Sequence, residues 1–110
     1  MLEGAVDSQY GIGDDIWDEY HDRGFDAGTN LKTTSGWIDN DNGTDIFGFS
    51  GLPAGYNTGD IGVAGIWWTS TFWNDPANTC NRGIGLGRPD IRRANTTKTF
   101  GLSVRCLRND

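Results

Sequence analysis

The chain has 110 residues, which is enough for one domain with its own core and too few for two. Only 35% of the residues are apolar while 17 are glycine, so a few large aromatic rings must bury most of the surface in a turn-rich fold. The net charge of −6 argues against a nucleic-acid partner, and the short apolar runs argue against membrane insertion.

The N-terminal part is expected to divide into residues 1–13, a flexible or poorly ordered lead-in rich in glycine, and residues 14–110, a single domain. The lead-in lacks the basic and apolar stretches of a secretory signal peptide. From Asp14 onward, Ile16, Trp17 and Tyr20 fit one face of a short helix, and an acidic start suits the helix dipole. We expect Gly24 to end that helix.

An acidic turn over residues 39–45 raises the question of a calcium site. Asp39 and Asp41 have the spacing of carboxylate ligands in such loops. An EF-hand loop that begins at residue 39 needs glycine at its sixth position and glutamate at its twelfth, where this chain has Thr44 and Ser50. We therefore interpret the segment as a polar turn and expect neither a metal site nor a cofactor.

The second half of the chain contains three stretches with the character of strands, residues 66–73, 80–86 and 100–106. In the last two, apolar residues alternate with small or polar ones, which is typical of a strand with one buried face. Residues 87–99 lie between them, contain Pro89 and show no such alternation. The pattern predicts a sheet that holds a long irregular loop.

Three ordered blocks carry a resemblance to a known family: residues 48–56 (GFSGLPAGY), 67–71 (WWTST) and 101–106 (GLSVRC). They resemble the "Fibrobacter succinogenes major paralogous" domain of bacterial surface proteins, over about residues 29–108. The resemblance implies an α+β, C-type lectin-like fold, with one or two short helices, a small twisted antiparallel sheet and long loops. It implies no reaction. Because the family's upstream strand has no counterpart here, we expect an N-terminally truncated domain.

The location of the protein depends on the resemblance. The resemblance implies a secreted or cell-surface bacterial protein, whereas the bare sequence favours neither export nor the cytoplasm. Export would in turn favour a disulfide, because such bonds persist in oxidising compartments.

The two cysteines form either a disulfide or two buried thiols, since with one histidine they cannot complete a tetrahedral zinc site. If residues 80–86 and 100–106 pair antiparallel, with Leu86 opposite Phe100, then Cys80 lies opposite Cys106 within bridging reach. Other strand orders remain open. A bridge would contribute about 3 kcal/mol in the chain-entropy description.

Acidic residues concentrate in residues 1–30 and arginines in residues 76–110. Either the two ends neutralise each other, or the arginine-bearing loop binds an anionic ligand through planar guanidinium groups. We expect a non-catalytic module that presents an Asn- and Arg-rich loop surface to a glycan, an anionic group or a protein. The candidate ligand-binding residues are Trp73, Asn74, Asn78, Arg88, Asp90, Arg92 and Asn95.

A structural or assembly module of a surface protein is the alternative function. An uncovered sheet edge would favour a homodimer, because unpaired backbone groups recruit another chain. We do not expect an enzyme, since the single His21 has no sequence signature of a nucleophile and an orienting group around it. A cysteine-dependent oxidase of a related fold is the third reading.

Overall fold

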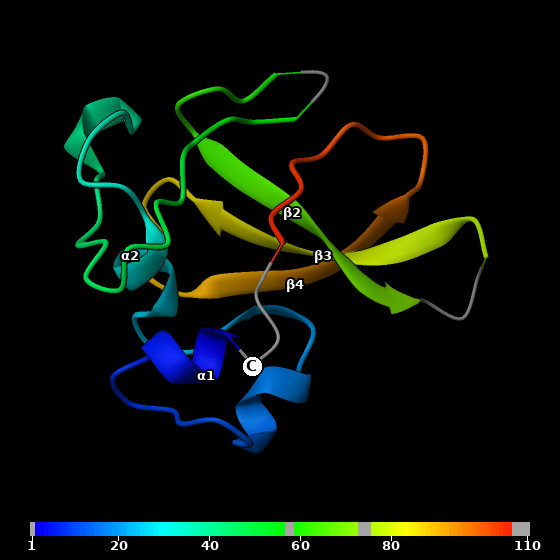
Figure 1. Ribbon diagram of the computed structural model, residues 1–110, viewed down its shortest axis with the longest axis horizontal. Coiled ribbons are helices and arrows are strands. Elements are labelled where there is room, and N and C mark those ends of the chain that lie inside the picture. The colour runs from blue at the N-terminus through cyan, green and yellow to red at the C-terminus, as the bar shows by residue number, and fades with distance from the viewer. Residues whose placement is uncertain (1, 57–58, 73–75, 107–110) are drawn as a thin grey trace.

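The computed structural model describes residues 2–56, 59–72 and 76–106. Within these residues, two short α-helices lie beside a four-stranded antiparallel sheet, which makes a small α+β fold (Figure 1). No helix in this part of the chain is long and apolar enough to cross a membrane. In chain order the elements are α1 (Leu2–Val6), the 3-10 helix η1 (Asp15–Asp18), β1 (His21–Arg23), α2 (Ala27–Leu31), the 3-10 helix η2 (Ile38–Asn40), β2 (Ala64–Phe72), β3 (Asn78–Gly85) and β4 (Ile91–Thr97).

The strands are ordered β1-β4-β3-β2 in the sheet. β2 and β3 confirm the strands predicted at residues 66–73 and 80–86, each with slightly different ends. They form the long hairpin seen in Figure 1, and β4 continues the meander on the far side of β3. β3 therefore has both of its edges occupied.

The helices cover one face of the sheet, which we call the inner face. Trp67, Arg82 and Arg93 lie opposite one another across β2, β3 and β4, so their side chains share this face. The two neighbouring strand residues Ile84 and Ile91 are each 2% exposed and belong to the same core. The buried core residues are Val6, Trp17, Ala27, Leu31, Trp37, Ile84 and Ile91.

The N-terminal residues are not the poorly ordered lead-in that their glycine content predicts. α1 places Val6 in the core at 4% exposure. A Cβ on Gly4 would lie 2.8 Å from the backbone of Ile12, so only glycine allows the chain to fold back this closely. The Asp7 carboxylate then accepts the backbone N–H groups of residues 25–27 at 2.8, 3.0 and 3.1 Å. These contacts make the segment part of the domain.

The helix predicted from Asp14 is shorter than its amphipathic pattern indicates. The Asp14 side chain accepts the N–H of Ile16 at 3.0 Å and starts η1, which buries Trp17 as expected. The chain then extends into β1, which pairs with the outer edge of β4. Hydrogen bonding to β4 therefore replaces a second helical turn, and Gly24 follows with a φ of 102°.

The expectations for the C-terminal part are wrong in two respects. Residues 91–97, assigned to a long loop, form β4. The strand predicted over residues 100–106 does not form; Ser103 makes a single parallel bridge to Trp67, and Val104 is 75% exposed. Because β2 and β4 occupy both edges of β3, the assumed pairing of residues 80–86 with 100–106 has no place in the sheet.

The predicted disulfide is also wrong, since it depends on that pairing. Cys80 is buried in β3, and its partner in the strand register is Asn95 of β4. Cys106 is exposed beyond the last bridge to the sheet, and both residues are free thiols.

Candidate functional site

The face of the sheet opposite the core, the outer face, carries two adjoining hollows of about 230 and 280 Å³. Gly83 lies opposite both Ile66 and Arg92 in the strand register, and these three residues line both hollows. A Cβ added to Gly83 would find its nearest neighbours 3.8 Å away, so the missing side chain leaves open space at this point. We call the two hollows together the outer-face groove.

One end of the outer-face groove is charged. The Arg88 guanidinium donates to both oxygens of Asp90, at 2.8 and 3.1 Å, and lies 3.4 Å from an oxygen of Asp22. Asp90, and after it Asp22, raises the pKa of Arg88. Arg92 is exposed, and its one polar contact within the described residues is to His21 Nδ1 at 3.5 Å. Arg88 is therefore held by carboxylates, while Arg92 keeps donors for a ligand.

The other end of the outer-face groove is aromatic. Tyr56 and Phe100 line it with ring centroids 6.4 Å apart and planes tilted by 51°. Phe100 is 41% exposed, so part of its ring faces solvent. The sequence does not indicate this pair, because its alternation pattern places Phe100 on a buried strand face and Tyr56 lies in a glycine-rich loop. No local pattern indicates that these two rings meet.

The structure brings together four of the seven predicted ligand-binding residues. Those that line the outer-face groove are Arg88, Asp90, Arg92 and Asn95. The Asn95 amide itself turns to Tyr20 Oη at 3.4 Å. Asn78 begins β3, beyond the residues that line the groove. Trp73 and Asn74 lie outside the described residues.

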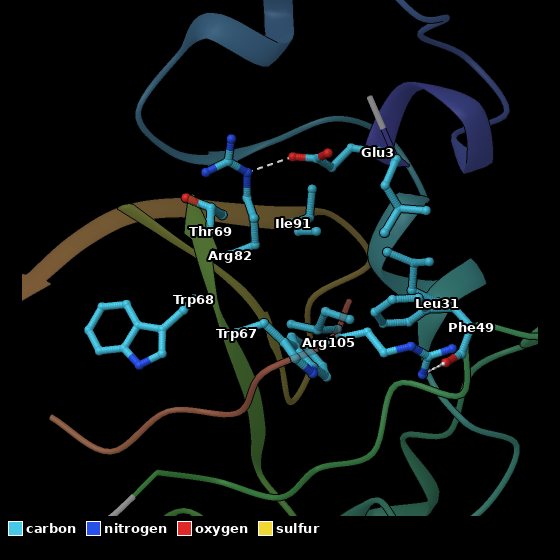
Figure 2. A pocket seen from close by; sticks show the side chains of 11 residues that line it. Glu3, Leu31, Phe49, Trp67, Trp68, Thr69, Arg82, Ile91 and Arg105 are labelled. Carbon is cyan, nitrogen blue, oxygen red and sulfur yellow. Dashed lines mark hydrogen bonds and ion pairs between the residues drawn. The ribbon is translucent and has the colours of Figure 1, made fainter. Parts of the chain in front are cut away.

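A separate hollow of about 170 Å³ lies on the inner face, and we call it the inner-face cleft. Figure 2 shows Glu3 and Arg82 at one end, and Phe49, Arg105 and Trp67 toward the other. The ring of Trp68 points away from the other side chains in this view. The lining residues are Leu2, Glu3, Leu31, Phe49, Trp67, Trp68, Thr69, Arg82, Ile84, Ile91 and Arg105.

At the polar end of the inner-face cleft, the Glu3 carboxylate is shared by two guanidinium groups, of which Arg82 lines the cleft and Arg23 does not. Glu3 Oε1 accepts Arg23 Nη2 at 3.0 Å and Arg82 Nε at 2.6 Å. Burial lowers the pKa of Arg23, Glu3 opposes this effect, and Arg82 and Arg93 add to it. Burial would raise the pKa of Glu3, but the hydrogen bond from its own backbone and those from Arg82 and Arg23 outweigh burial and lower it. The cluster therefore carries excess positive charge.

The acidic turn does not gather its carboxylates into one site. Asp41 pairs with Lys32 Nζ at 2.7 Å and also accepts the backbone N–H of Gly87 at 2.7 Å. Asp45 instead accepts both the backbone N–H and the hydroxyl of Ser50. Among the residues that the structure describes, no group of three His, Cys, Asp or Glu side chains is placed to hold a metal ion.

No protein-family model matches the chain, and neither a curated protein nor a solved structure is significantly similar to it. The outer-face groove and the inner-face cleft are therefore the features of this chain that bear on its function.

Proposed function

We propose that the protein is a non-catalytic carbohydrate-binding module whose ligand lies in the outer-face groove. The observation that carries the proposal is that the groove has two different ends. Tyr56 and Phe100 form an aromatic end in one hollow, and charged groups held by ion pairs form the other end in the adjoining hollow. A sugar ring has an apolar C–H face that packs on aromatic rings and hydroxyl groups that need planar donors and acceptors. Both kinds of partner lie on one face of the sheet.

The charged end suits hydroxyl recognition because its groups are already oriented. Arg88 holds the carboxylates of Asp22 and Asp90 within one cluster, and each carboxylate keeps lone pairs for hydroxyl donors. Arg92 offers a planar fork of N–H groups, which can donate to neighbouring oxygens of one ligand. Pre-oriented groups lose little conformational entropy when the ligand binds.

The C-type lectin-like architecture and a secreted or cell-surface location remain parts of this proposal. They depend on the resemblance of residues 48–56, 67–71 and 101–106 to the bacterial surface family. The α+β fold and the antiparallel sheet support the architecture at the level of fold class, and the location depends on the resemblance alone. The fold carries the site and does not by itself identify the ligand.

A glycan array followed by titration calorimetry tests the proposal. Tyr56→Ala and Phe100→Ala should each weaken the best glycan about threefold to tenfold, the range for loss of one aromatic contact. The matched control is Phe25→Ala, since Phe25 is also exposed, at 53%, and does not line the groove. Binding that survives both groove variants unchanged, or the absence of any glycan ligand, would refute the proposal.

A structural or assembly role is the second candidate. Several large apolar side chains are exposed on loops, including Ile46 at 63%, Phe47 at 58% and Ile61 at 77%. Exposed apolar surface of this kind often marks a protein interface. Sedimentation at micromolar concentration should then show a two-fold dimer, whereas a monomer over the whole concentration range would contradict this role.

A further inference from the structure

The inner-face cleft forms a second site that the carbohydrate proposal does not use. We propose that it binds a small monocarboxylate with an aromatic or branched aliphatic body. In this arrangement the carboxylate lies against Arg82, and the body lies between Trp67 and the buried floor of the cleft. The inference does not depend on the proposed function, because the inner-face cleft and the outer-face groove lie on opposite faces of the sheet.

The floor and rim of the inner-face cleft suit an apolar body. Leu31, Ile84 and Ile91 line the floor and are 1%, 2% and 2% exposed, while the half-buried Trp67 and Phe49 form the rim. Their rings meet edge to face with centroids 5.6 Å apart. Protein interiors are packed closely, and an engineered apolar cavity of about 150 Å³ takes up benzene. The cleft, at about 170 Å³, has room for a group of that size.

The polar end of the cleft selects the charge of the ligand. Arg23 donates through Nη1 to the Ile91 carbonyl oxygen at 2.9 Å and through Nη2 to Glu3 Oε1 at 3.0 Å, and it does not line the cleft. Arg82 uses Nε for Glu3 and Nη1 for the Asn81 carbonyl oxygen at 3.2 Å. Within the described residues its Nη2 has no hydrogen-bond partner. Because two guanidinium groups share one carboxylate, one positive charge of the cluster is not neutralised, and a second anion can pair with it.

A single carboxylate fits this end better than other charges. A neutral ligand would form no charge-assisted hydrogen bond with Arg82 Nη2, and a cation would be repelled by the guanidinium groups of Arg82 and Arg23. A ligand with two negative charges at this end would bring one charge more than Glu3, Arg23 and Arg82 together can neutralise. At the opposite end, Arg105 lies 4.9 Å over the Phe49 ring and donates to the Phe49 carbonyl oxygen at 2.8 Å. That contact closes the far end around the ligand body.

Wild-type protein provides the first test, which needs no variant. Phenylacetate, benzoate and isovalerate are titrated at low ionic strength, with tryptophan fluorescence and calorimetry as readouts. The same is done with phenylacetamide, which keeps the body of phenylacetate and lacks its charge. We expect phenylacetate to bind about tenfold or more tightly than the amide, because charge-assisted hydrogen bonds are the stronger ones. Equal affinities, or no binding of any of the three carboxylates, would overturn the proposal.

Matched variants locate the site. Arg82→Gln should lower phenylacetate affinity about tenfold, whereas Arg92→Gln, on the outer face of the sheet, should leave it unchanged. Trp67→Leu should weaken binding and Phe25→Leu should not, since Phe25 is exposed and does not line the cleft. Leu2→Trp keeps every charge and should block the cleft, so it serves if Arg82→Gln does not fold. Equal effects of the two arginine variants, equal effects of Trp67→Leu and Phe25→Leu, or unimpaired binding to Leu2→Trp would refute the assignment.

Discussion

Replacing Glu3 by glutamine tests whether buried ion pairs hold α1 against the sheet. Glu3 Oε1 accepts Arg23 Nη2 at 3.0 Å and Arg82 Nε at 2.6 Å, and the Arg23 side chain is 0% exposed. Glutamine keeps the shape of the side chain and one acceptor oxygen while it removes the charge. Loss of one partner from a buried pair costs about 3–5 kcal/mol. Because the Arg82 side chain is 22% exposed and can be rehydrated, we expect a loss of about 3 kcal/mol.

The same network predicts how stability depends on pH. The pKa of Glu3 is lowered, because its hydrogen bonds and the charge of Arg82 outweigh the effect of burial. A carboxyl group with a lowered folded-state pKa contributes stability above its unfolded pKa of 4.5, and that contribution is lost as the pH falls through the folded-state value. Wild-type protein should therefore lose more stability between pH 7 and pH 3 than Glu3→Gln does. Urea denaturation at several pH values measures both quantities.

Glu19→Gln is the matched control, since Glu19 is exposed and directly follows η1. Its stability should stay within about 0.5 kcal/mol of wild type at neutral pH. A cost for Glu3→Gln as small as that of the control would refute the reasoning. It would mean that α1 is not part of the cooperative fold and that the first residues behave as the sequence alone predicts.

Further predictions concern thiols and packing. Native protein should take up one alkylating label, at exposed Cys106, and a second at buried Cys80 only after unfolding. Intact mass measures the number of labels, and two unreactive cysteines in the native protein would show that the disulfide forms after all. Asp7→Ala should cost about 2 kcal/mol in thermal or urea unfolding, because its carboxylate accepts several backbone N–H groups; an unchanged midpoint would contradict this. Trp17→Ala should cost about 3–5 kcal/mol, since Trp17 is 1% exposed, and the half-buried Trp68→Ala should cost clearly less by the same measurement.

Local sequence patterns are enough to predict the hairpin of β2 and β3 and the surface position of several polar side chains. Large side chains in residues 66–73 and alternation in residues 80–86 predict β2 and β3, because a half-buried strand needs only a period of two. Arg88, Asp90 and Arg92, which the sequence predicts as ligand-binding residues, line one hollow of the outer-face groove, and their role in binding stays a prediction.

β4 illustrates what such patterns miss. Its inward-facing Arg93 lies 5.1 Å from the Tyr20 ring centroid and donates to the Asp18 carbonyl oxygen, where an alternation pattern would require an apolar residue. The strand forms because β3 and β1 offer hydrogen bonds along its edges. A strand with polar residues on both faces carries no periodic signal in the sequence.

Tertiary structure alone decides the role of the N-terminal carboxylates and the position of the groove aromatics. Glu3 meets Arg23 and Arg82 across 20 and 79 residues of chain, and Tyr56 meets Phe100 from a different loop. Composition indicates that the chain contains enough charge and enough aromatic rings, but not which of them meet. A local stretch of sequence never contains both partners of these contacts. The sequence therefore predicts a lead-in over residues 1–13 and a strand over residues 100–106, whereas the folded chain has the Glu3 ion pairs in the first segment and the contact of Phe100 with Tyr56 in the second.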